Sequence, residues 1–341
     1  MKRQALLGTW IVIGAALVIG VLVARDSSST TPADVVGSGT DLALTDDATE
    51  ANGASAAETT TTVAPTTAAP TTAAQATTTT TSPDQQELPA DAAALADALT
   101  EAELMVRSSD DPAPWGRRQQ QLYRLLTANR EWAPDVIAGV SEDVRPAVEL
   151  NWDARLNLSA LVSSGPLSTV LPAWRIREPL PADELVAMYQ AAEDQTTIPW
   201  EYLAAINLVE TRMGRIEGLS TAGATGPMQF LPSTFAECCE GDPTDDSDAI
   251  IGAAVYLTLR GGPDNMAAAL RGYNNSARYV DAVTAYATVL EDDPAAYAGY
   301  HAWDVYFLSA AGLIRMPVGY NEPEPVAATD WVAANPEAVI N

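Results

Sequence analysis

The sequence contains very few of the side chains on which most cofactor and metal chemistry depends. Among its 341 residues there is one lysine, Lys2, one histidine, His301, and one pair of cysteines, Cys238 and Cys239. A single histidine excludes a multi-histidine metal site, and two cysteines alone cannot make a zinc site. With its one lysine at position 2, an exported body has no lysine that could form a Schiff base. We therefore expect neither a cofactor nor a metal.

The two cysteines are adjacent in the chain. Their Cα atoms lie about 3.8 Å apart, closer than the roughly 4.4–6.8 Å of ordinary disulfides. The sequence leaves three states open for Cys238-Cys239: reduced thiols, a strained vicinal disulfide, or a link to another chain. We expect the pair to be a loop feature without a catalytic role.

Basic residues are also scarce, with 18 Lys and Arg against 45 Asp and Glu, for a net charge of −27. Nucleic-acid affinity depends on basic side chains that neutralise phosphates, so we expect no nucleic-acid partner. Chemistry in this chain must come from carboxylates, hydroxyls, amides and aromatic rings.

The N-terminal residues 1–25 contain an uncharged run of 21 residues, 4–24, between Lys2-Arg3 and Arg25. At 1.5 Å per residue this run is roughly 31 Å long as a helix, about the thickness of one hydrocarbon core. It predicts a single-pass anchor, and a cleavable signal peptide is the alternative. The positive pair precedes the run, so the body is expected outside the cytoplasm, attached to the cell membrane.

Residues 26–88 have almost no large apolar side chains, and 13 of the 23 residues from Thr59 to Thr81 are threonine. Such a segment cannot bury enough apolar surface to offset its ordering entropy, so it is expected to be a disordered linker.

The remaining chain predicts a mainly α fold. Apolar residues recur at helical spacing in Ala92–Val106 and Arg117–Asn129, so residues 89–181 are expected to be a helical accessory region. Residues 182–320 carry the chemical motifs, and alternating apolar residues after Trp303 predict a short hairpin that turns at Gly312. The Pro/Glu/Ala-rich residues 321–341 are expected to be a disordered tail.

Glu210 is the most informative carboxylate. It lies seven residues after Leu203 and four after Ile206, which places it on an apolar helix face. Burial raises the pKa of a carboxyl group, as a general acid requires. The alternative is a structural ion pair with Arg212 or Arg215.

Four sequence blocks occur in order around and after Glu210: Ala204–Gly214, Ser220–Pro232, Ala253–Leu257 and Ala269–Asn274. Together they resemble the soluble-lytic-transglycosylase family, the peptidoglycan-cleaving relatives of goose-type lysozyme. The resemblance covers about residues 185–290, and the chain departs from it at Cys238-Cys239, where relatives tend to have an aromatic–glycine turn.

The resemblance implies a lysozyme-like catalytic domain in an exported, membrane-anchored protein, with peptidoglycan glycan strands as its substrate. Glu210 falls on the family's catalytic acid/base. Protonated Glu210 would cleave the β-1,4 bond between MurNAc and GlcNAc. As a carboxylate it would then take the C6 hydroxyl proton, closing a 1,6-anhydro ring without water. The substrate-binding positions implied by the resemblance are Ser220, Met228, Gln229, Tyr273 and Asn274.

Two other functions remain open from the sequence. A muramidase-type hydrolase generally employs two carboxylates, and the second one would be Glu217 or a distant Asp. A non-catalytic peptidoglycan-binding scaffold would need no acid at all. Protein partners are not indicated.

Overall fold

The computed structural model describes residues 81–161 and 166–340. The predicted anchor and residues 26–80 of the predicted linker lie outside this range. None of the helices in the described residues has the length and apolar character needed to cross a membrane.

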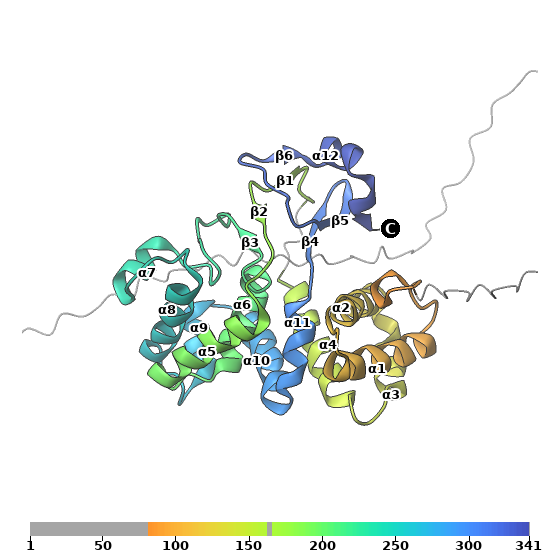
Figure 1. Ribbon diagram of the computed structural model, residues 1–341, viewed down its shortest axis with the longest axis horizontal. Helices are drawn as coiled ribbons and strands as arrows, with labels where there is room; N and C mark the ends of the chain where they lie inside the picture. Colours follow the sequence, from red (N-terminus) through yellow and green to blue (C-terminus); the bar gives the residue numbers. More distant parts are fainter. Residues whose placement is uncertain (1–80, 162–165, 341) are drawn as a thin grey trace, which may run out of the picture. The chain divides into compact units, whose positions relative to one another are not determined.

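The described residues form a mainly α protein, as the sequence predicts (Figure 1). The α-helices are α1 Ala92–Ser108, α2 Ala113–Ala128, α3 Ala133–Gly139, α4 Arg145–Ser159, α5 Ala182–Thr196, α6 Trp200–Thr211, α7 Pro232–Cys238, α8 Asp246–Leu259, α9 Met266–Tyr273, α10 Ala277–Asp292, α11 Tyr297–His301 and α12 Ala328–Ala334. The strands are β1 Val170–Leu171, β2 Arg175–Ile176, β3 Ile216–Glu217, β4 Val305–Ser309, β5 Gly312–Met316, β6 Val326–Ala327 and β7 Val339–Ile340.

Helix α10 joins the two halves of the helical core. It packs along α4 on one side and α6 on the other. Its buried residues include Val283, Tyr286 and Leu290, at the three- and four-residue spacing of one helix face. A single apolar cluster runs from Leu95 in α1 to Trp303 after α11. The predicted accessory region therefore shares its core with the predicted catalytic region, and no gap in packing marks the boundary at residue 181.

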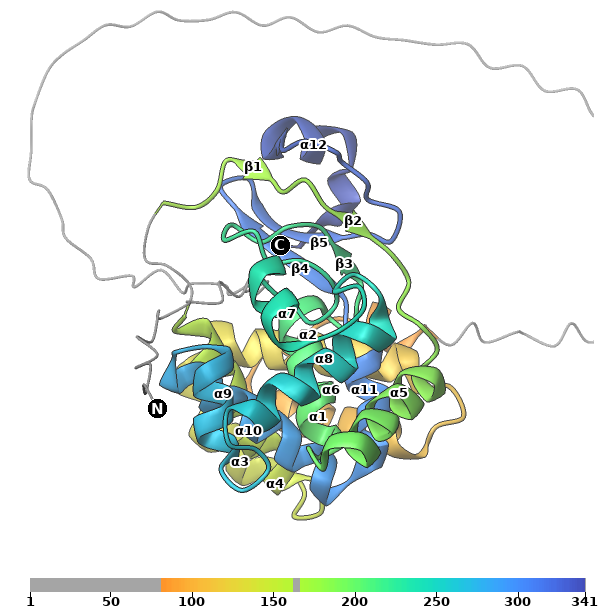
Figure 2. The same ribbon diagram turned by 90° about the vertical axis from the view of Figure 1, so that its left-hand side faces the viewer.

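A second, smaller core lies among the short strands. Its buried members come from distant parts of the chain and include Leu171, Trp174, Ile216 and Ile314. The strands pair antiparallel as β1 with β6, β2 with β3, and β5 with both β4 and β7. Figures 1 and 2 show these strands and α12 together on one side of the helices. The predicted hairpin is confirmed, with Ser309 opposite Gly312 at its turn.

The predicted disordered tail, residues 321–341, is wrong for the residues that the structure describes. Strands β6 and β7 pair with β1 and β5, and the Trp331 ring contacts Tyr320 edge to face at 5.7 Å. Ala328 and Ala338 are buried in the second core. A strand of two residues is too short to show an alternation of apolar and polar side chains. The sequence prediction of disorder therefore rested on composition alone.

The end of the predicted linker is also corrected. The 3₁₀ helix η1, Pro83–Gln85, packs on α2. Asp84 makes an ion pair of 2.6 Å with Arg117, and the Arg118 guanidinium donates to the carbonyls of Gln86 and Glu87. These polar contacts order residues 83–87 without a large apolar side chain, which is why hydrophobicity did not reveal them.

Candidate active site

Glu210 sits in the last turn of α6, in the interior of the protein. The sequence predicts a helix with one buried face, but every residue of α6 from Leu203 to Thr211 is buried. The Glu210 residue is only 1% exposed. Because an ionised carboxylate loses its hydration at such a position, burial favours the protonated acid.

The two carboxyl oxygens of Glu210 have different surroundings. The Tyr279 hydroxyl, from the first turn of α10, donates a hydrogen bond of 2.7 Å to Oε1. Oε2 is buried and has no hydrogen-bond partner among the described residues. Burial raises the pKa of Glu210 to about 7, against the opposing effect of the Tyr279 hydrogen bond. One oxygen is thus held in place, and the other is left for a proton and a reaction partner.

The alternative in which Glu210 is half of a structural ion pair is wrong. Among the described residues, no ion pair joins Glu210 to an arginine. The Arg215 guanidinium lies 3.2 Å from Glu178, and Arg212 donates to the Leu208 carbonyl of its own helix. The carboxyl group is therefore buried without a counter-ion.

Hydrogen bonds hold the loop after β3 against α6, close to Glu210. Thr211 Oγ1 and Asn207 Nδ2 donate to the Pro227 carbonyl at 2.6 and 2.9 Å. Thr225 and Phe230 exchange backbone hydrogen bonds around a turn that contains Gly226, whose φ is +76°. A Cβ at Gly226 would lie 1.7 Å from the Pro243 carbonyl oxygen, so only glycine fits there. The turn delivers the next two predicted site residues.

Met228 and Gln229 are both buried in this turn. The Met228 carbonyl accepts a hydrogen bond of 2.6 Å from Tyr273. Gln229 has a left-handed φ of +50°, and its Nε2 donates to the Gly226 carbonyl. Its Oε1 is buried without a hydrogen-bond partner in the described residues. Buried polar atoms are normally satisfied, so Gln229 Oε1 and Glu210 Oε2 are two exceptions to that rule.

Tyr273 connects the loop to α10. Its ring lies parallel to that of Tyr279 at 6.5 Å and meets Phe230 edge to face at 5.6 Å. The nearby Glu210 charge contributes to raising the pKa of Tyr273, after burial. The structure therefore brings Glu210, Met228 and Tyr273 together.

Two predicted site residues have other local roles. Ser220 Oγ accepts hydrogen bonds from the backbone N–H groups of Ala222 and Ala224, so it shapes its own loop. Asn274 is half-buried at the end of α9, and its N–H donates to the Leu270 carbonyl. Neither residue makes a hydrogen bond to Glu210.

Tyr279 was not predicted as a site residue. It begins a buried stripe on α10 that continues with Val283 and Tyr286. A tyrosine in such a stripe carries a hydroxyl that needs a partner. That requirement was a usable signal, but the partner's identity depends on how α10 packs against α6.

Glu217, the proposed second carboxylate of a hydrolase, is held by two arginines. Its oxygens lie 2.9 Å from Arg175 Nη1 and 3.1 Å from Arg177 Nε. Its backbone is in β3, which pairs with β2. These ion pairs occupy the carboxylate that a general base would need free.

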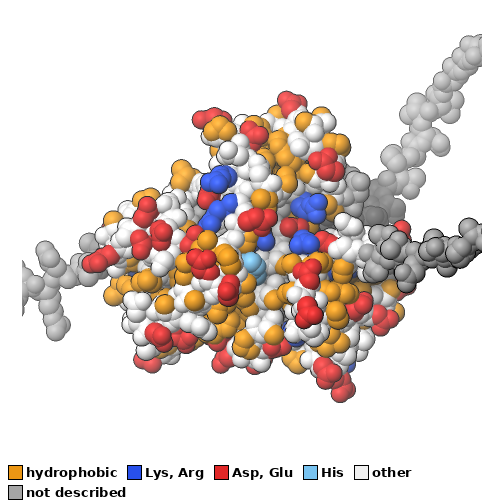
Figure 3. Space-filling view, viewed as in Figure 1, with side chains coloured by type: hydrophobic (Ala, Val, Ile, Leu, Met, Phe, Trp, Pro, Cys, Tyr) orange, Lys and Arg blue, Asp and Glu red, His pale blue; other side chains and the backbone are white. Residues whose placement is uncertain are grey.

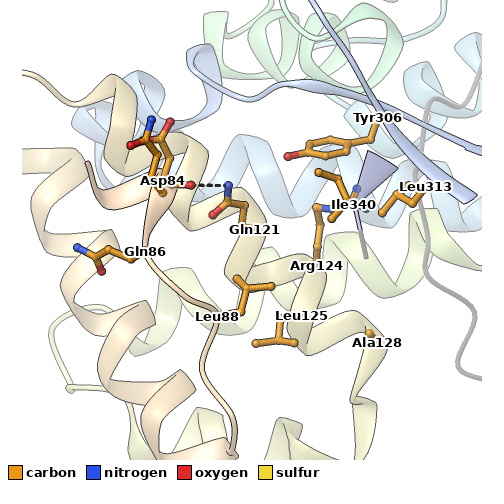
Figure 4. A pocket seen from close by; sticks show the side chains of 11 residues that line it. Asp84, Gln86, Leu88, Gln121, Arg124, Leu125, Ala128, Tyr306, Leu313 and Ile340 are labelled. Atoms are coloured by element: carbon orange, nitrogen blue, oxygen red, sulfur yellow. Dashed lines mark hydrogen bonds between the residues drawn. The ribbon is translucent and has the colours of Figure 1, made fainter. Parts of the chain in front are cut away.

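None of four well-defined cavities in the described residues is lined by Glu210. Figure 4 shows the first of them, a mostly apolar cavity of about 220 Å³ beside η1 and α2. It contains no predicted site residue, and the Gln121 side chain donates across its wall to the Asp84 carbonyl. Glu210 is 1% exposed and its Oε2 is buried, so the carboxyl group is enclosed in this conformation.

Cys238 and Cys239 are joined by a disulfide at the end of α7. Cys239 Sγ contacts the Gly252 carbonyl of α8, and neither cysteine bonds to a predicted site residue. No group of three or more potential metal ligands occurs in the described part of the chain.

Searches of protein-family models, curated proteins and solved structures found no match.

Proposed function

We propose that the protein is a peptidoglycan lytic transglycosylase with a lysozyme-like catalytic region. The observation that carries this proposal is the state of Glu210: enclosed, without a counter-ion, and with a pKa raised to about 7. A carboxyl group with this pKa is partly protonated at neutral pH, so it can give a proton to a leaving oxygen and later take one back. The family resemblance supplies the substrate class.

The hydrogen bonding around Glu210 supports the two steps of this reaction. Tyr279 fixes Oε1, so Oε2 is the oxygen that would protonate the glycosidic oxygen between MurNAc and GlcNAc. The resulting carboxylate would accept the C6 hydroxyl proton as the 1,6-anhydro ring closes. The attacking hydroxyl belongs to the same sugar, and such proximity contributes up to roughly 7–11 kcal/mol in favourable cases.

The muramidase alternative requires a second carboxylate that can activate water or stabilise the cation. Glu217 is engaged with Arg175 and Arg177 and does not meet that requirement. A single acid/base therefore accounts for the site better than a pair does.

The enclosure of Glu210 adds a condition to the proposal. With Oε2 buried, cleavage requires that the glycan separate the side chains over Glu210 when it binds. Gln229, whose Oε1 is free, is suited to accept a hydrogen bond from a sugar hydroxyl or amide once the site opens. Excluding water from the closed site would favour ring closure over hydrolysis.

The test is digestion of purified peptidoglycan by the purified protein, with the products identified by mass spectrometry. We expect 1,6-anhydro ends, and a fall in rate of about 10²–10⁴-fold for Glu210→Gln. Glu201→Gln on the first turn of the same helix is the matched control and should leave the rate nearly unchanged. Reducing ends in place of anhydro ends would establish a hydrolase. Binding without cleavage by the wild-type protein would establish a scaffold.

We also propose that residues 4–24 anchor the protein in the cell membrane with its body on the cell-wall side. Cell fractionation tests this directly. The full chain should stay with the membrane, whereas release of a protein that begins near Arg25 or Asp26 would show that a signal peptide had been cleaved.

A further inference from the structure

A second cavity of about 280 Å³ lies between the helices and the strands, and none of the predicted site residues lines it. We name it the arginine cavity, because three guanidinium groups line it. Its lining residues are Arg117, Ile176, Arg215, Asp304, Val305, Arg315, Met316, Pro317 and Val318. This volume approaches the lower end of the size range of small-molecule sites.

The three arginines reach the cavity from three separate elements. Arg117 comes from α2, Arg215 from the segment between α6 and β3, and Arg315 from β5. The chain has a net charge of −27, so a cavity lined by three arginines and one acidic residue contrasts with its overall composition. Figure 3 shows most of the basic side chains of the visible face near its middle, over the region of β2 and β4 in Figure 1, with acidic side chains both among them and elsewhere.

Arg215 carries the most direct indication of a missing ligand. The residue is 8% exposed, and its Nε is buried without a hydrogen-bond partner among the described residues. Its other nitrogens donate to the His301 carbonyl and to Glu178, whose side chain is 73% exposed. A buried guanidinium N–H without an acceptor is costly, and Arg215 is one of the residues that line the cavity.

Arg315 is also incompletely paired. Its nearest carboxylate, Asp304, lies 3.9 Å away, at the limit of an ion pair. Asp304 is the one acidic residue that lines the cavity. Burial raises the pKa of Asp304, and the charges of Arg315, Arg215 and Arg117 all act to lower it. All three arginines therefore act electrostatically on the Asp304 carboxyl group.

We propose that the arginine cavity binds a phosphate group, either as inorganic phosphate or as a small phosphate ester. Guanidinium forks match oxyanions, and a tetrahedral phosphate presents oxygens to donors that approach from three directions. A planar carboxylate satisfies one or two forks at most. Three arginines and one carboxylate line the cavity; Arg117 and Arg215 also pair with Asp84 and Glu178, which leaves Arg315 with the longest ion pair of the three.

The test is titration calorimetry of the purified full chain with inorganic phosphate at constant ionic strength. We expect saturable binding of one phosphate with a Kd of about 1 mM or lower. Glycerol phosphate should bind similarly if the cavity accepts an ester, and more weakly if it accepts the free ion alone. The absence of saturable binding up to about 20 mM, or equal binding of acetate, would overturn the proposal.

Variants locate the binding within the protein. Arg315→Gln should weaken phosphate binding about tenfold, because a half-exposed side chain with one distant partner is removed from the cavity. Arg175→Gln is the matched control: an exposed strand arginine in one ion pair, outside the cavity. Equal loss in both variants would show general electrostatic attraction and refute a built site.

Asp304→Asn gives a readout of opposite sign that a loss of folding cannot imitate. It keeps the two backbone hydrogen bonds to Gln120 and removes the negative charge from the cavity, so phosphate should bind about three- to tenfold more tightly. Unchanged or weaker binding would contradict the proposal. Glu210→Gln should bind phosphate like the wild type, which separates this site from the proposed catalytic one.

Discussion

Replacing Glu210 by glutamine should stabilise the protein at pH 8 and leave its stability nearly unchanged at pH 4. The pKa of Glu210 is raised from 4.5 to about 7 in the folded protein, chiefly by burial. The folded state therefore holds a proton that the unfolded state releases between these two values. Stability must fall as the pH rises through this window, because the unfolded chain binds fewer protons there.

The size of this effect follows from the shift. Each pKa unit corresponds to about 1.4 kcal/mol, so a rise from 4.5 to about 7 removes about 3 kcal/mol of stability by pH 8. Glutamine has no proton to lose and keeps an oxygen that accepts from Tyr279. The free energy of unfolding of the variant should therefore exceed that of the wild type by an amount that grows from near zero at pH 4 to about 3 kcal/mol at pH 8.

Urea denaturation at half-unit pH steps measures this difference, and the many other carboxylates cancel between the two proteins. Glu149→Gln, on the exposed side of α4, is the matched control and should differ from wild type by less than about 0.5 kcal/mol throughout. Parallel curves for Glu210→Gln and wild type would refute the reasoning. A variant less stable at pH 8 would show that the carboxylate has a stabilising partner.

Three further predictions concern Tyr279, the turn at Gly226 and the disulfide. Tyr279→Phe removes a hydrogen bond that lowers the pKa of Glu210, so the pH above which glycan cleavage declines should move upward, and a profile that stays in place would contradict this. Gly226→Ala should cost at least about 2 kcal/mol in denaturation experiments, because its φ is +76° and Pro243 blocks a Cβ. Gly223 has a similar φ but open space where a Cβ would lie, so Gly223→Ala should cost only about 1 kcal/mol. Replacing Cys238 and Cys239 together by serine should preserve cleavage in a folded protein, and loss of activity without loss of fold would give the pair a catalytic role.

Helix positions followed closely from sequence periodicity. The spacing over Ala92–Val106 predicted a helix, and α1 runs from Ala92 to Ser108. The burial of Glu210 was also predicted from its spacing to Leu203 and Ile206. Both inferences use contacts within one helix, and periodicity reports such contacts directly.

Contacts between distant segments could not be predicted in the same way. The bond between Tyr279 and Glu210 depends on how α10 crosses α6, and the two-residue strands depend on partners far along the chain. The arginine cavity is a similar case, since Arg117 and Arg315 are separated by most of the described sequence. The proline and glutamate content of residues 321–341 predicted disorder. In the structure they are ordered because β6 pairs with β1 and β7 pairs with β5.

The pairing of β1 with β6 has a consequence for synthesis of the chain. Val170 and Leu171 leave the ribosome about 155 residues before their partners Val326 and Ala327. At roughly 5–20 residues per second this delay lasts on the order of 10–30 s. Throughout that interval β1 has no β6 to pair with and is an open strand edge. Until β6 has been synthesised, the nascent chain thus exposes an unpaired strand edge to which other chains or chaperones could bind.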